Sequence, residues 1–178
     1  GTFVPLQGVP LIFSAARILS ARNVAVKFTV IGSGQTAPEC GEVPDNMTWI
    51  KSWVELSKLV EFIRCADICL GVFGQEGKVD RVWPYKNYWS MLLGKVVVTG
   101  AKVDLVADAP AYFLSERSSE SLAGLLEDIA VGAFPLMLST DIKGFYDANL
   151  SNQVGLSALL RRIREIQVIE KRSENIER

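Results

Sequence analysis

The sequence predicts an α/β fold in which a parallel sheet is covered by helices on both of its faces. Short apolar segments rich in β-branched residues alternate along the chain with amphipathic segments of helical spacing. Each of these segments is apolar and short, which favours a parallel sheet covered on both faces. Glycine-rich turns at residues 32–34 and 71–74 follow two of them. Because ligands bind beyond the carboxyl ends of such strands, these turns mark the edge where a site is expected.

The first half of the chain opens with a helix. Residues 9–20 have apolar side chains at helical spacing, namely Val9, Ile12, Phe13, Ala16 and Leu19. Residues 24–31 alternate and are β-branched, which predicts a strand that ends at the glycines of residues 32–34. Residues 47–50 predict a short strand, and residues 54–64 an amphipathic helix.

The second half continues the alternation. Apolar runs predict strands over residues 66–72, 96–99 and 111–114, the last being the weakest. Helical spacing predicts helices over residues 87–93, 119–131, 141–149 and 154–170. The helix over 154–170 has an apolar and a basic side, and we expect it to pack on its own domain rather than on lipid.

Composition fits one folded domain. The chain has 178 residues, of which 49% are hydrophobic and 22% charged. We expect residues 1–170 to form the domain and residues 171–178 a polar tail. A parallel sheet normally opens with a strand, whereas this sequence opens with a loop and a helix. We therefore expect the chain to lack the first strand of its fold.

Several classes of function are excluded by composition. With 19 basic and 20 acidic residues the net charge is -1, so no general attraction to nucleic acid is expected. The absence of histidine excludes Ser-His-Asp and Cys-His catalysis and argues against a metal such as zinc. The three cysteines lack zinc-ligand spacing, which favours free thiols in the core and a reducing compartment. No run is long enough to span a membrane, so we expect a cytoplasmic location and leave association with the inner face of a membrane open.

The turn at residues 32–34 begins a loose match to the dinucleotide fingerprint G-x-G-x-x-A, which extends to Ala37. A nicotinamide-dependent oxidoreductase would be one interpretation. However, Pro38 interrupts the helix that should follow, and no acidic residue ends the next strand, where Lys51 and Trp53 lie instead. We therefore interpret the glycines as turn residues.

The loop after the strand over residues 66–72 carries three cations, Lys78, Arg81 and Lys86, together with aromatic residues. Arginine offers a forked donor and lysine a point charge to phosphate oxygens, so the set suits a diphosphate. A solvated charged loop is the alternative.

Trp49 is expected to be a core or edge aromatic residue, whereas Trp53 lies beyond a strand and could form the wall of a pocket for a flat base.

Several segments, in one order and spacing, resemble the donor-binding half of retaining glycosyltransferases of group 1, which have two Rossmann-like domains (the GT-B fold). The matching segments are residues 1–8, 28–34, 66–74, 78–86 and 94–99. The resemblance implies a Rossmann-like domain that binds a nucleotide-diphosphate sugar, with no metal or other cofactor. It also implies a separate N-terminal domain that holds a sugar or lipid-linked acceptor, and a role in building a polysaccharide or glycolipid.

The resemblance also implies roles for residues. Lys78 and Arg81 would neutralise the departing diphosphate, with Lys86 beside them. Thr2 and Gln7 would offer hydrogen bonds to the phosphates, and Phe73 and Gly74 would line the site.

The sequence departs from the family at two places. The glutamate pair of the family falls on Arg81 and Trp89, and an indole cannot accept hydrogen bonds from ribose hydroxyls. The sugar-facing acidic residue that often follows the strand over residues 96–99 is not obvious, and Asp104 and Asp108 are possible substitutes. A non-catalytic domain that serves as a protein-interaction or regulatory module is therefore a second hypothesis.

Overall fold

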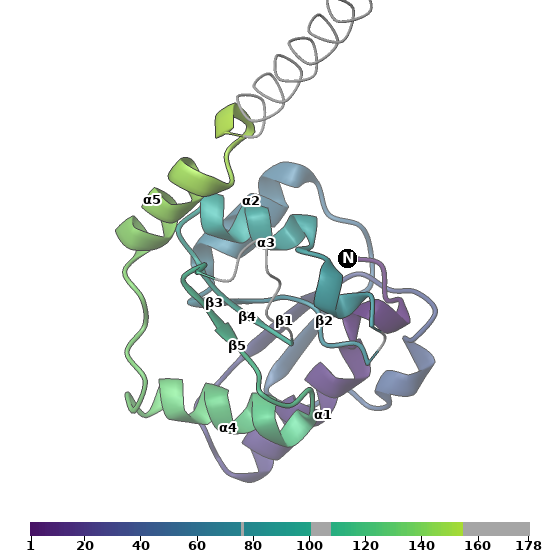
Figure 1. Ribbon diagram of the computed structural model, residues 1–178. Coiled ribbons are helices and arrows are strands. Elements are labelled where there is room, and N and C mark those ends of the chain that lie inside the picture. The colour runs from purple at the N-terminus through teal and green to yellow at the C-terminus, as the bar shows by residue number, and fades with distance from the viewer. Residues whose placement is uncertain (76, 101–107, 155–178) are drawn as a thin grey trace, which may run out of the picture.

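The computed structural model describes residues 1–75, 77–100 and 108–154 of the chain. Within them, five strands alternate with helices (Figure 1). The strands are β1 (Phe28–Ile31), β2 (Met47–Ile50), β3 (Ile68–Leu70), β4 (Val96–Thr99) and β5 (Ala111–Phe113). The α-helices are α1 (Val9–Ala21), α2 (Leu56–Cys65), α3 (Tyr85–Leu92), α4 (Ser119–Ala130) and α5 (Ser139–Asn149). Three short 3-10 helices are η1 (Pro5–Gln7), η2 (Pro38–Cys40) and η3 (Val79–Arg81).

Every strand pair in the described residues is parallel, as the sequence predicts. The strands form two groups, a pair β1-β2 and a three-stranded sheet β3-β4-β5. The register of the pair aligns Phe28 with Met47, and that of the sheet aligns Ile68 with Val96. Because all strands point the same way, the loops that follow them gather at one edge.

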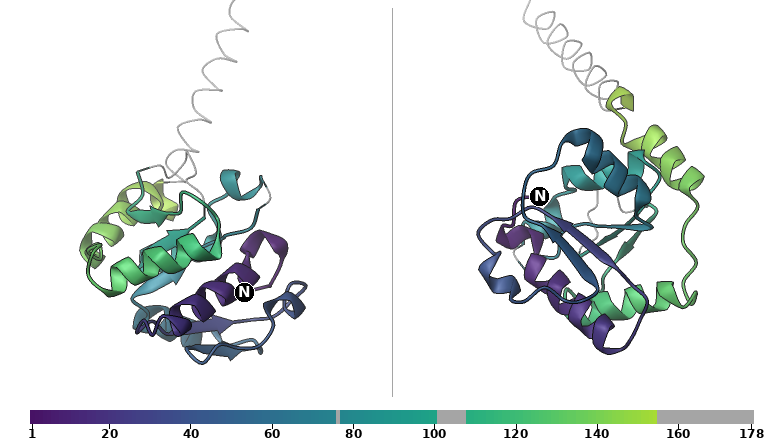
Figure 2. Two further views of the ribbon diagram at one scale, coloured as in Figure 1. Left: turned by 90° about the horizontal axis from the view of Figure 1, so that it is seen from below. Right: turned by 180° about the vertical axis from the view of Figure 1, so that it is seen from behind.

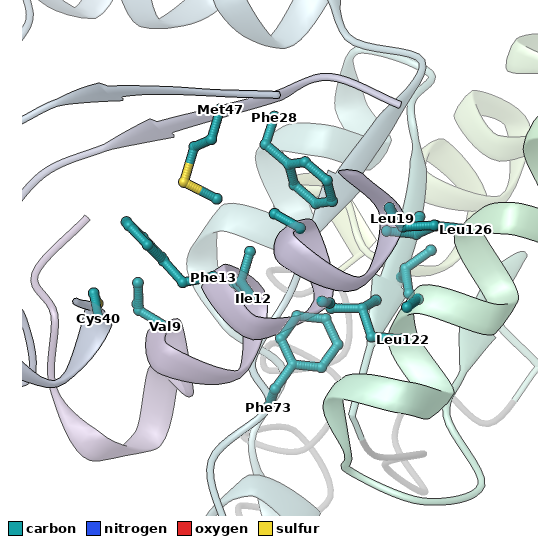
Figure 3. Packing of buried hydrophobic residues seen from close by; sticks show 14 of the residues in the cluster. Val9, Ile12, Phe13, Leu19, Phe28, Cys40, Met47, Phe73, Leu122 and Leu126 are labelled. Atoms are coloured by element: carbon teal, nitrogen blue, oxygen red, sulfur yellow. The ribbon is translucent and has the colours of Figure 1, made fainter. Parts of the chain in front are cut away.

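Helices cover the strands from two sides (Figures 1 and 2). Helices α1 and α4 lie together on one side, and α2, α3 and α5 lie on the other. The larger core cluster fills the α1–α4 side, and Figure 3 shows Phe13, Phe28 and Met47 between α1 and the strands, with Leu122 of α4 near Phe73. A smaller cluster joins β4 and β5 to α3 and α5, around the buried side chains of Met91 and Ile142.

The observed elements differ from the predicted ones mainly at their ends. Residues 24–27 are not part of β1, contrary to the prediction. The amide of Val24 instead donates to Leu19 at the end of α1, and the amide of Val26 donates to Val24, so this segment is a turn that leaves the helix. Helix α3 begins two residues earlier than predicted, because Pro84 is extended and precedes a helical Tyr85. The helix predicted over residues 154–170 lies outside the described residues except for its first residue.

The prediction that the cysteines serve as small core residues is correct for Cys40, which is buried. It is wrong for Cys65, which is exposed. Cys65 is the last residue of α2, and none of the residues of that helix is buried.

Candidate functional site

The N-terminal loop meets the segment after β3 at the carboxyl edge of the strands. The amide of Phe73 donates to the Gln7 carbonyl at 3.2 Å, and the amide of Gly74 donates to Leu6 at 3.1 Å. A Cβ on Gly8 would lie 2.5 Å from the Phe73 carbonyl carbon, and one on Gly74 would lie 2.4 Å from the Pro5 oxygen. Glycine at both positions therefore lets two backbone segments touch.

The same edge is fixed from the other side by β4. Thr99, at the end of β4, accepts a hydrogen bond from the Val72 amide at 3.2 Å through its hydroxyl oxygen. A Cβ on Gly71 would lie 2.4 Å from that Thr99 oxygen. The chain leaving β3 is thus held between the N-terminal loop and β4, by backbone contacts on the first side and by the Thr99 hydroxyl on the second.

Lys86 lies in the first turn of α3 and reaches the N-terminal loop. Its Nζ donates to Oε1 of Gln7 at 2.7 Å, although the two residues are 79 positions apart. The side chain is half-buried, and loss of hydration lowers the pKa of Lys86 to about 8, while nearby Cys69 raises it. The structure therefore brings together two residues that the sequence nominates separately.

Lys78 and Arg81 are exposed, at the start and the end of η3. Within the described residues, the side chains of Lys78 and Arg81 form no ion pair and no hydrogen bond, whereas Lys86 bonds to Gln7. Asp80, which lies between Lys78 and Arg81 in the same loop, has its carboxylate paired with the guanidinium of Arg117 at 3.0 Å. Lys78 and Arg81 therefore lie on the exposed rim of this edge, and Lys86 is the cation that hydrogen-bonds to the N-terminal loop.

Arg117 is a residue of this edge that the sequence reasoning missed. It follows β5, its guanidinium binds Asp80, and its carbonyl accepts a hydrogen bond from the Gln75 side chain at 2.6 Å. Its position four residues after β5 is a usable signal, since a cation just beyond a predicted parallel strand lies at the ligand-binding edge.

The other nominated residues lie in different environments. Thr2 is exposed and forms a parallel bridge with Ser33. Phe73 is 1% exposed and its ring packs into the core, so only its backbone reaches the edge. Trp53 is 90% exposed, and Trp89 is half-buried with its ring centroid 6.4 Å from that of Tyr85.

Trp49 packs in the core, as the sequence predicts. Its ring stacks on Phe3 with centroids 5.7 Å apart and meets Phe13 edge-on at 5.2 Å. Its Nε1 donates to the Gly32 carbonyl at 2.8 Å, so the indole also holds the turn after β1.

The glycines of the loose dinucleotide fingerprint are turn residues. A Cβ on Gly34 would lie 2.8 Å from backbone atoms of Phe3, and one on Gly32 would collide with Gly1. The loop then enters η2, a 3-10 helix of three residues, rather than the long helix whose N-terminus would bind a pyrophosphate.

Among the described residues, no group of three histidine, cysteine, aspartate or glutamate side chains is placed to hold a metal ion. No helix in the same residues is both long and apolar enough to cross a membrane.

Comparison with known proteins finds similarity at the level of structure. No protein-family model matches the chain, and no curated protein is significantly similar. Among solved structures, the chain is similar to the C-terminal domain of a glycosyl transferase group 1 family protein (LpcC) from Francisella tularensis. The TM-score is 0.64 at 14% sequence identity, and the match covers 85% of this chain and 84% of the other. The chain therefore has the fold of the C-terminal, Rossmann-like domain of a group 1 glycosyltransferase.

Proposed function

We propose that this chain binds the nucleotide-diphosphate sugar of a retaining glycosyltransferase at the carboxyl edge of its strands. The observation that carries the proposal is the contact between Lys86 and Gln7, where a half-buried ammonium is directed to the loop that precedes α1. Charge interactions are stronger at a half-buried position than in water, so one such cation adds substantially to diphosphate binding. The fold supports the same assignment, because ligands of parallel sheets bind at this edge.

The proposed chemistry is transfer of the sugar to an acceptor with retention of configuration. Lys86 holds the diphosphate from within, and the exposed Lys78 and Arg81 move onto it from the rim. Their positive charge stabilises the diphosphate as it departs from the anomeric carbon. Thr2 and Gln7 add neutral hydrogen bonds. An N-terminal domain contributes the acceptor, a sugar or a lipid-linked sugar, and the product is a polysaccharide or glycolipid.

Calorimetry with UDP- and GDP-sugars tests the diphosphate site. We expect Lys86→Met to weaken donor binding by more than about tenfold, since a charge-assisted hydrogen bond contributes roughly 1.5 to 3 kcal/mol. Reversing the charge of Lys78 and Arg81 together should have an effect of at least this size. Lys27→Met, an exposed lysine just before β1 at the opposite edge, is the matched control and should bind normally. Unchanged affinity in the first two variants would remove the proposed site.

A second candidate function is a non-catalytic interaction or regulatory module with the same fold. Trp89 favours it, because this indole lies half-buried beside Tyr85 at the position where ribose hydroxyls would need an acceptor. Thermal unfolding with a panel of nucleotide sugars separates the two functions. A bound donor raises the unfolding temperature by an amount that grows with its concentration relative to its Kd, whereas a module without a donor site gives no shift with any of them.

A further inference from the structure

The backbone of η3 decides where the charges of Lys78 and Arg81 lie. Both side chains are exposed, and no ion pair or hydrogen bond of the described residues holds either of them. The helix is anchored to the core by one residue, Val79, which is fully buried and packs with Val72 and Leu6. One apolar contact fixes a point of this loop, and its orientation depends on further contacts.

Arg117 contacts the same loop at two further places. Its Nη1 donates to Oδ1 of Asp80, within η3, at 3.0 Å. Its carbonyl accepts a hydrogen bond from Nε2 of Gln75 at 2.6 Å. Arg117 lies on the segment after β5, 37 positions from Asp80 and 42 from Gln75. The loop that carries the two cations is therefore joined to the segment after β5 both through a side chain and through the backbone.

The side chain of Arg117 is itself confined by Gly100. A Cβ on Gly100 would lie 2.9 Å from both Cγ and Cδ of Arg117, so the aliphatic part of the arginine passes directly over this glycine. The Gly100 amide donates to the Val72 carbonyl at 2.8 Å, which ties this position to the segment that leads to η3. The arginine side chain is only 20% exposed. Packing thus restricts it before the ion pair forms, which removes part of the entropy cost that weakens exposed ion pairs.

The ion pair also removes a competitor for the two cations. Asp80 lies between Lys78 and Arg81 in the chain. An unpaired carboxylate at that position would attract the same cations that the proposed diphosphate needs. In the described residues the Asp80 carboxylate is paired with Arg117, so its charge is neutralised from the side of β5.

We propose that Arg117 is a positioning residue of the diphosphate site. By binding Asp80 and Gln75 it fixes the orientation of η3, and by neutralising Asp80 it leaves Lys78 and Arg81 available to phosphate oxygens. Arg117 acts through this loop and does not itself bind the diphosphate. Its role in ligand binding rests on the proposed function, whereas its contacts with the loop do not.

Limited digestion of the full chain with trypsin, followed by mass spectrometry, tests the hold on η3 without any ligand. Trypsin cleaves after Lys78 and Arg81, and the loop must open before the protease can bind it. We expect Arg117→Gln to speed cleavage at these two bonds by about three- to fivefold, the effect of losing a partly exposed ion pair. Arg117→Lys keeps the charge and should give an intermediate rate. Arg22→Gln is the matched control, because it removes the ion pair with Glu127 at 2.6 Å and should leave both bonds unaffected.

Calorimetry with inorganic pyrophosphate separates a positioning role from direct binding. Arg117→Gln should weaken pyrophosphate binding by about threefold or more, but in an Asp80→Asn background the same substitution should change it by less than about twofold, because the contact is already lost.

Unchanged cleavage or unchanged affinity in Arg117→Gln overturns the proposal. An equal loss of affinity in both backgrounds also overturns it, since Arg117 would then bind the anion itself. Failure of pyrophosphate to bind the unmodified chain would remove the proposed function, and the digestion would still decide whether Arg117 fixes η3.

Discussion

At the scale of single residues, Lys86 costs the fold stability, because its charged form is disfavoured where it lies, but the proposed function needs that charge. Its ammonium is withdrawn from water into a contact with Gln7, and the pKa falls to about 8. A lowered pKa means that folding disfavours the charged form of this lysine. Groups that cost stability in this way are common where a charge is needed for ligand binding.

The pH dependence of stability follows from this shift. The ordinary pKa of a lysine side chain is 10.5, so between about pH 8 and 10.5 the unfolded chain holds more protons at this site than the folded chain. The contribution of Lys86 to the free energy of unfolding therefore rises with pH across that window. We expect Lys86→Met to have a higher urea midpoint than the unmodified chain at pH 7, with a smaller difference at pH 10. Lys27→Met is the control, and an equal difference at both pH values would contradict the assignment.

The same lysine predicts how anion binding responds to pH. Donor affinity should fall as the pH rises through about 8, because Lys86 loses its charge there in the free protein. Calorimetry at pH 7 and 9 measures this fall, and Lys86→Met should show a smaller one. Binding that is equally strong at both pH values would show that Lys86 does not contact the anion.

At the scale of elements, the site edge is built from loops that touch through their backbones. Residues 5–8 and residues 73–74 approach so closely that side chains do not fit between them. The hydrogen bonds from Phe73 and Gly74 then fix the N-terminal loop relative to β3. The positions of Gln7 and Lys86 depend on this contact between the two loops. The contact therefore supports the site without itself binding a ligand.

Two glycine-to-alanine substitutions test whether close approach of two backbone segments requires glycine at position 74. Gly74→Ala places a methyl group against backbone atoms of Pro5 and Leu6, and we expect destabilisation by about 1–3 kcal/mol. Gly124→Ala lies in α4 with no atom near the added methyl group, and it should stabilise by about 0.5–1 kcal/mol through helix propensity. Urea unfolding measures both, and a neutral Gly74→Ala would mean that the two loops separate readily.

At the scale of the whole molecule, one core connects the helical layer to the site. The larger cluster joins α1, α4, β1 and β2, and it includes Phe73 from the segment after β3 (Figure 3). Packing against α4 therefore helps to determine where the 71–74 segment lies.

Truncation of this core should be costly. Leu122 in α4 is fully buried, so Leu122→Ala should lower the free energy of unfolding by about 2–5 kcal/mol. Leu138 is 66% exposed, and Leu138→Ala should change stability by less than about 0.5 kcal/mol. Denaturant titration of both variants provides the comparison, and similar losses would show that burial does not determine these costs.

Much of the fold could be predicted because its signals are local. Helical spacing located α1, and the valine run located β4 with its exact bounds. The start of β1 could not be predicted, because Val24 and Val26 have strand propensity but their amides are used in a turn after α1. Tertiary contacts override propensity most readily at the ends of elements.

The sequence by itself determined the α/β class and the parallel strands, since these follow from periodicity and from the glycines after strands. It also predicts the edge at which a ligand would bind. Only the tertiary structure decided that Lys86 is the cation that hydrogen-bonds to the N-terminal loop, and that Arg117 forms an ion pair with Asp80. It also decided that β1 and β3 are not neighbours in one ladder. These contacts join residues far apart in the chain, and the spacing of residues carries no information about such pairs until the backbone is folded.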